Sequence, residues 1–130
     1  MIRPQYHFRD SPEGLMAWNV ARLIRLSRDL PIEDVPLSVI AELDEPYWGS
    51  SPTTVRDVVE HMRLAQAADT TIPIILCGDG RIMDGMHRVA RVLLDGDRTI
   101  QARRFAKTPV PDHIGVPPGD LSYHAKDFQI

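Results

Sequence analysis

The stretch "IPIILCGDGRIMDGMHRVARVLLDGDRTIQARRF", residues 72–105, decides the fold. It begins with an apolar run, residues 72–77, of the kind found in strands that are covered on both faces. Asp79-Gly80 is a turn signal that leads into a second strand, residues 81–84. Residues 86–94 carry apolar side chains at helical spacing, and Asp95-Gly96 is a stop signal. The stretch therefore predicts a hairpin over 72–84, a helix over 86–94 that packs on it, and a last strand over 99–105.

The passage from strand to helix places Asp84, Gly85, Met86, His87 and Arg88 together. The first N–H groups of a helix lack intrahelical partners and form the positive end of the helix dipole. A glycine lets the backbone approach a ligand, and an arginine offers a fork of charged donors to phosphate oxygens. The pattern predicts a phosphate site at residues 84–88, with Arg88 as its main charged group.

A simpler interpretation fits the same residues. Asp84 is then only the N-cap of the helix, His87 lies at the boundary of the core, and Arg88 and Arg91 are solvated surface charges. A helical wheel at about 100° per residue places Arg88 opposite the apolar face, so its removal is expected to cost little stability. The wheel assigns that apolar face to Met86, Val89, Ala90 and Leu93.

Outside this stretch, capping and breaking residues divide the chain. Ser11-Pro12 predicts the start of a first helix that ends before Pro31, with Trp18 and Leu23 on a stripe that packs on the body or on a second copy, as in a homodimer. Residues 32–36 predict a short strand followed by a helical turn. Ser51-Pro52 predicts the start of a middle helix. Its expected buried stripe consists of Val55, Val58, Val59, Met62 and Ala65.

The resulting fold class is α+β, a small single domain with a short mixed sheet. We expect a helical extension over 1–30, a core over 31–106 and an irregular tail over 107–130. The 130 residues are 43% hydrophobic and carry a net charge of −3. This acidic balance argues against a dedicated DNA-binding module. Without a signal peptide or a long apolar segment, and with a single cysteine, a cytoplasmic protein with no membrane partner is expected.

The run 72–105, together with the strand and helix expected upstream of it, resembles the ParB/sulfiredoxin superfamily over about residues 31–105. In that family a strand pair leads into a short motif, often Asp-Gly-x-[His/Arg]-Arg, at the start of a helix that binds nucleotide phosphates. Asp84, Gly85, His87 and Arg88 match the free-serine-kinase branch, from which Met86 departs. Met86 also occupies the position of the sulfiredoxin cysteine, which argues against sulfinic acid reduction. A partition protein would continue into a helix-turn-helix domain, for which the chain leaves no room.

The resemblance implies a nucleotide-binding domain, a phosphotransferase or nucleotide hydrolase, that takes ATP or CTP with Mg²⁺. Gly85, Met86, His87 and Arg88 would then contact the nucleotide, Asp84 and His87 would be catalytic, and Asp84 would also be the metal ligand. The alternative is a non-catalytic module that binds a partner or regulates it, and a nuclease ranks lower.

Several further residues are candidates for this site. Tyr47 and Trp48 lie in a turn-rich loop, where an aromatic ring can cover a nucleotide base, whereas His61 is expected to face solvent. A kinase also needs a carboxylate as base or magnesium ligand. The sequence does not choose among Glu33, Asp34, Glu42, Asp44 and Glu45.

Overall fold

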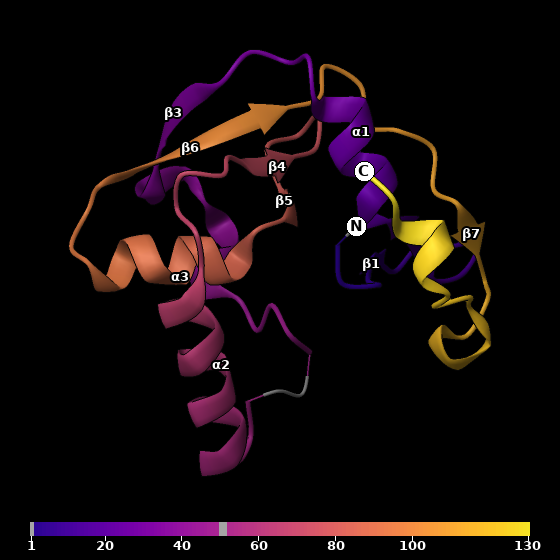
Figure 1. Ribbon diagram of the computed structural model, residues 1–130, viewed down its shortest axis with the longest axis horizontal. Helices are drawn as coiled ribbons and strands as arrows, with labels where there is room; N and C mark the ends of the chain where they lie inside the picture. Colours follow the sequence, from indigo (N-terminus) through magenta and orange to yellow (C-terminus); the bar gives the residue numbers. More distant parts are fainter. Residues whose placement is uncertain (1, 50–51) are drawn as a thin grey trace.

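The computed structural model describes residues 2–49 and 52–130 and shows an α+β protein with two sheets (Figure 1). Within these ranges, no helix is long and apolar enough to cross a membrane. The strands and α-helices are, in chain order, β1 (Tyr6–Arg9), β2 (Met16–Asn19), α1 (Val20–Ser27), β3 (Glu33–Pro36), α2 (Val55–Ala67), β4 (Ile74–Leu76), β5 (Ile82–Asp84), α3 (Met86–Leu94), β6 (Thr99–Arg104) and β7 (His113–Ile114). Short 3₁₀ helices lie at Leu37–Val39, Ala41–Asp44, Pro118–Asp120 and Ala125–Phe128.

The larger sheet has the strand order β3-β6-β4-β5 and is mixed. Strand β6 runs antiparallel to β3 and parallel to β4, while β4 and β5 form the antiparallel hairpin that the sequence predicts. All three residues of β4 are buried, as expected for a strand covered on both faces. Helix α3 has the predicted bounds and packs on β4 and β6.

The face of α3 that packs on the sheet differs in part from the apolar face that the helical wheel predicted. Met86 and Val89 are buried as predicted, but Val92 is buried in place of Leu93, which is 53% exposed. The predicted face was therefore wrong at Leu93, because the short helix meets the sheet along the line of residues 86, 89 and 92 rather than along a full helical stripe.

The expected first helix from Ser11 was wrong over its first half. Residues 6–9 and 16–19 pair as a β-hairpin, and only residues 20–27 are helical. Ser11 and Gly14 exchange backbone hydrogen bonds across the turn. Gly14 has a φ of +125°, and a Cβ there would lie 2.9 Å from the Cα of Gly115. This close approach of a residue from the tail, which local sequence does not show, explains why a turn forms where a helix cap was expected.

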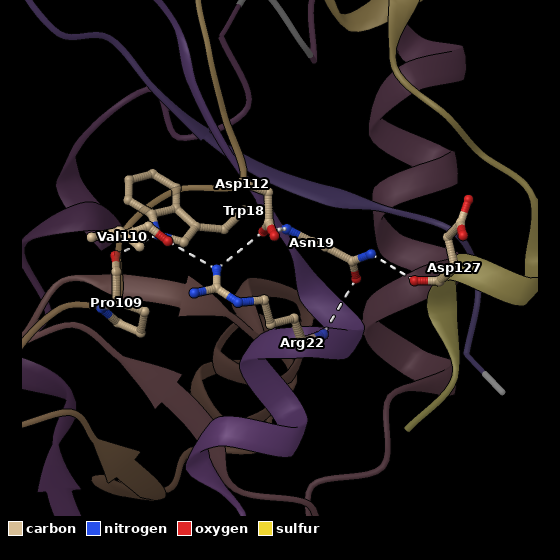
Figure 2. Close-up of polar contacts among 7 residues, drawn as sticks. All are labelled: Trp18, Asn19, Arg22, Pro109, Val110, Asp112 and Asp127. Carbon is tan, nitrogen blue, oxygen red and sulfur yellow. Dashed lines mark hydrogen bonds and ion pairs between the residues drawn. The ribbon is translucent and has the colours of Figure 1, made fainter.

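The second sheet joins the two ends of the chain, because its order is β1-β2-β7. Ile2 N–H donates to the carbonyl of Phe128, so the ends lie side by side (Figure 1). Figure 2 shows the contacts that hold the tail to β2 and α1. Trp18 Nε1 donates to the carbonyl of Pro109 at 2.8 Å, and Asp112 accepts from the backbone N–H of Asn19 at 2.8 Å. The segments 1–30 and 107–130 therefore fold together.

Trp18 and Leu23 are 2% and 0% exposed. They pack on the body of the same chain, as predicted, rather than on a second copy. They share a cluster with two side chains of the larger sheet, Ile75 and Met83, and with the residues that directly follow β4 and β6, Cys77 and Phe105. This cluster joins the segment before β3 to the core.

Helix α2 begins at Val55 with Thr54 as its N-cap, and the expected cap Ser51 lies outside the described residues. The buried stripe was wrong for four of its five members, since only Ala65 is buried. The other four are exposed, at 81% for Val55, 44% for Val58, 48% for Val59 and 54% for Met62. The reason is that α2 meets α3 through a different face, on which His61 and the backbone of Gln66 make contacts.

We predict that Phe128→Ala lowers the free energy of unfolding by about 3–5 kcal/mol, the usual cost of truncating a buried phenylalanine. Phe128 is fully buried and meets the ring of Tyr6 edge-on at 5.4 Å. Urea unfolding measures the change. Ile130→Ala, at a half-exposed site two residues away, should change the free energy by about 0.5 kcal/mol or less. Equal effects of the two changes would contradict the role of the tail in the core.

Candidate functional site

The strand-to-helix turn at residues 84–87 forms a wall shared by two cavities of about 550 and 570 Å³. Arg3 and Gln5 from the N-terminal segment and Leu64 from α2 also line both cavities. Three parts of the chain that are distant in sequence therefore enclose one cleft, with the predicted phosphate turn at its centre.

Gly85 is the N-cap of α3, with a φ of +116°, and no side chain caps the helix. A Cβ on Gly85 would lie 2.5 Å from Cγ2 of Ile74, so only glycine fits this position without a shift of the strand. The prediction that Asp84 caps α3 was therefore wrong. The first N–H groups of α3 keep their donor capacity at a cleft wall.

The guanidinium of Arg88 is bound by its own chain. Nη1 donates to the carbonyls of Ile72 at 3.0 Å and Pro73 at 2.7 Å, and Nη2 donates to Oδ2 of Asp84 at 2.8 Å. The Arg88 side chain is only 14% exposed. It ties the start of β4 to the start of α3, so the expectation of a solvated surface charge was wrong.

Asp84 is the partner of this guanidinium, and its side chain is 16% exposed. Burial raises the pKa of the Asp84 carboxyl above its usual value, while the positive charge of Arg88 opposes that rise. The carboxylate is thus held by an ion pair at the base of the cleft, where it lines both cavities.

A stack of three rings forms the side of the cleft. The ring of Trp48 lies 4.0 Å from that of His61 and 4.8 Å from that of His87, at interplanar angles of 25° and 21°. Nδ1 of His61 lies 2.9 Å from Nε2 of His87, so one nitrogen donates to the other. The expectation that His61 faces solvent was wrong. Burial, followed by the charges of His61 and Arg3, lowers the pKa of His87, which favours its neutral form.

The acidic candidates of the first strand and its turn lie elsewhere. Glu42 is 4% exposed and accepts from the backbone N–H of Ile82 at 2.5 Å, so it anchors the hairpin. Glu45 pairs with Arg81 at 2.6 Å, and Glu33 pairs with Arg104 at 3.4 Å. None of these carboxylates, nor Asp34 or Asp44, is among the side chains lining the two cavities at residues 84–87.

No protein-family model, curated protein or solved structure matches this chain. The resemblance to the ParB/sulfiredoxin superfamily therefore remains a prediction. Asp84, Gly85, His87 and Trp48, which the sequence singled out, all line the 570 Å³ cavity. The sequence missed the part that Arg3, Gln5 and His61 play, because a single histidine on a helix and two residues near the N-terminus carry no spacing signal.

His7 on β1 is a second half-buried imidazole in the wall of the 570 Å³ cavity. Its Nε2 accepts a hydrogen bond from Nε of Arg9 at 2.9 Å, which requires that nitrogen to be unprotonated. Burial, and then the positive charge of Arg9, lowers the pKa of His7 from 6.5 to about 4. The fold therefore holds His7 neutral.

We predict that Arg88→Ala lowers the free energy of unfolding by about 3–5 kcal/mol, because it leaves the buried Asp84 carboxylate unpaired. Arg91→Ala is the matched control on the same helix. Arg91 forms an exposed pair with Asp95, worth about 1 kcal/mol or less, and also donates to the carbonyl of Gln66. Urea unfolding of both variants tests the difference. Similar losses would show that the buried pair has no special structural role.

We predict that stability falls as the pH drops from about 6.5 to about 4. The folded pKa of His7 is lowered, so the unfolded chain binds more protons in this window, and the stability present above pH 6.5 is progressively lost. The contribution of one group is at most about 1.4 kcal/mol per pH unit. Urea unfolding across this range should give a shallower pH dependence for His7→Gln than for the wild type. Parallel curves would exclude His7 as the source.

Proposed function

We propose that this chain is a nucleotide-phosphate-binding domain of ParB/sulfiredoxin type, and that it binds phosphate at the N-terminus of α3. The observation that carries the proposal is the start of α3, which no side chain caps and which opens into the cleft beside Arg3 and His87. Backbone donors, the helix dipole and a nearby guanidinium together favour an anion.

The roles of the residues differ from those expected from the motif. Arg88 orients the turn through its bonds to Asp84 and to the carbonyls of Ile72 and Pro73 rather than offering free donors. Arg3 is exposed at the mouth of the cleft, where its guanidinium contacts the side chain of Gln5. We therefore assign to Arg3 the charged contact that the sequence assigned to Arg88.

His87 is the residue best placed for proton transfer in this proposal. Its imidazole is held neutral in the free protein and is hydrogen-bonded to that of His61, so it can take up a proton as an anionic phosphate binds and then act as a proton donor in the cleft. Asp84 acts on this site by holding Arg88, which makes it a positioning residue.

The chain's own residues do not fit a resident Mg²⁺ site. Asp84 is paired with a guanidinium, and the described residues contain no cluster of three or more potential metal-ligating side chains. Mg²⁺ usually binds through one or two carboxylates together with substrate phosphates. In the proposed complex, Mg²⁺ would therefore arrive with the phosphates of ATP or CTP rather than reside on the protein.

One observation favours the non-catalytic alternative. Asp84 and Arg88, two residues of the proposed motif, satisfy each other and stabilise the turn. This structural role is sufficient for a non-catalytic module that keeps the fold and binds or regulates a partner. Measuring binding and phosphate release separately distinguishes the two functions.

We predict that ATP, CTP or GTP binds with an affinity that rises as the pH falls from about 7.5 to 6. An anion stabilises the protonated form of His87, whose pKa in the free protein is lowered, and one coupled proton gives at most about a tenfold change per pH unit. Calorimetric titration with and without Mg²⁺ measures the affinity. His87→Gln should bind with a weaker pH dependence, and Arg3→Gln should bind about tenfold more weakly.

Arg91→Ala is the control for these titrations, because its guanidinium pairs with Asp95 and does not line either cavity. It should bind nucleotide as the wild type does. The proposal fails if none of the three nucleotides binds to the folded wild type, or if Arg3→Gln and His87→Gln bind like the control.

A further inference from the structure

The lining of the 550 Å³ cavity continues from the turn at residues 84–88 to the C-terminal end of α1. Ile24, Arg28, Ile75 and Arg103 line this part of the cavity, and none of them lines the 570 Å³ cavity. We call these four residues the α1 subsite. The volume of the whole cavity lies within the range of about 300–1,000 Å³ that is typical of small-molecule sites.

The two arginines of the α1 subsite form no ion pair with a carboxylate of the described residues. Arg28 is exposed and makes no hydrogen bond or ion pair within residues 2–49 and 52–130. Arg103 is half-buried, and its guanidinium donates to the carbonyl of Leu30, which anchors the group and leaves further N–H donors for a ligand. Because a planar guanidinium matches the oxygens of an oxyanion, the α1 subsite offers charged donors for such a group.

The acidic side chains of the same lining do not cancel these charges. Asp84 is paired with Arg88 at 2.8 Å. Asp69 is exposed and accepts hydrogen bonds from the backbone N–H and the hydroxyl of Thr71 at 3.0 and 2.6 Å. Arg3 adds a further guanidinium, which donates to an amide rather than to a carboxylate. The cavity therefore has an excess of positive charge in a chain whose net charge is −3.

The wall between these charges is aliphatic. Ile24 and Ile75 belong to the α1 subsite, and Leu64 and Ile72 continue the apolar wall toward α2. None of the described residues that line this cavity is a phenylalanine, tyrosine or tryptophan, whereas all three types line the 570 Å³ cavity. An aliphatic wall removes a hydrocarbon chain from water, but it offers no ring on which a nucleotide base could stack.

We propose that the α1 subsite binds an aliphatic monocarboxylate. Arg28 and Arg103 contact the carboxylate, and the chain lies on the isoleucines of the wall. Helix α1 ends at Ser27, and the C-terminal end of a helix is the negative end of its dipole, which disfavours a dianion more than a monoanion. A phosphate finds better donors in the free N–H groups at the start of α3. The α1 subsite is thus separate from the proposed phosphate site.

Calorimetric titration of octanoate into the full chain tests the proposal. Octanoate should bind with a dissociation constant on the order of 0.1–1 mM. Acetate lacks the chain, and octylamine carries the same chain with a positive charge, so each should bind at least about tenfold more weakly. The titration contains no nucleotide, and its result is therefore independent of whether a nucleotide binds at α3.

Two substitutions test the assignment of the carboxylate. Arg28→Gln should weaken octanoate binding about tenfold without a loss of stability, because Arg28 is unbonded in the folded chain. Arg103→Gln should weaken binding by a similar factor, and Arg28→Gln decides the question if Arg103→Gln does not fold. Arg98→Gln is the control, since it makes the same change of charge at an exposed residue that lines neither cavity.

Amide-resolved NMR locates the bound chain. With octanoate, the backbone amides of Ile24 and Ile75 should shift, and that of Trp48 in the 570 Å³ cavity should not. The proposal is overturned if octanoate does not bind the wild type, or if acetate or octylamine binds as tightly. It is also overturned if Arg28→Gln binds like Arg98→Gln, or if the shifts are confined to the 570 Å³ cavity.

Discussion

The ion pair between Asp84 and Arg88 fixes the geometry on which the site depends. It joins the end of β5 to the first turn of α3, and the same guanidinium holds two carbonyls at the entry to β4. Gly85 lies between the two charges, pressed on Ile74 in a backbone conformation that favours glycine. A buried ion pair adds little net stability compared with apolar packing, but breaking it leaves a charge without a partner. Its main effect is therefore to hold one arrangement of the turn.

This arrangement determines the electrostatic character of the cleft. The charge of Asp84 is balanced by Arg88, and Glu33, Glu42 and Glu45 are engaged outside the two cavities. Two imidazoles near the turn, those of His7 and His87, have lowered pKa values and are neutral at pH 7. The lining of the 550 Å³ cavity also carries Arg3, Arg28, Arg103 and Asp69, so basic side chains outnumber acidic ones beside the positive end of α3.

The sequence predicted those parts of the fold whose signals are local. The hairpin over 72–84 and helix α3 follow from an apolar run, a turn dipeptide and helical spacing, and all of these were confirmed. The helix expected from Ser11 failed because residues 16–19 form strand β2, which pairs with β1 along its whole length and also with His113 and Ile114, about a hundred residues away in the chain. The expectation that Arg88 is a solvated charge failed for a related reason. A helical wheel shows on which side of the helix a residue lies, but it does not show the carbonyls of Ile72 and Pro73 that approach from another segment. His61 and Arg3 reach the cleft only through tertiary packing, for which single-residue patterns give no signal.

The sheet β1-β2-β7 has a consequence for the order in which the protein folds. Met16 and Ala17 pair with Ile114 and His113, and Asn19 donates to the carbonyl of Asp127, so this sheet needs contacts between residues separated by nearly the full chain. Contacts of such long range form slowly, and during synthesis on the ribosome they must wait until the tail has emerged. The larger sheet closes with β6, before the tail is made. The wall of the cleft that carries Arg3 is therefore completed last, and a nascent chain forms the turn at Asp84 well before the cleft around it is complete.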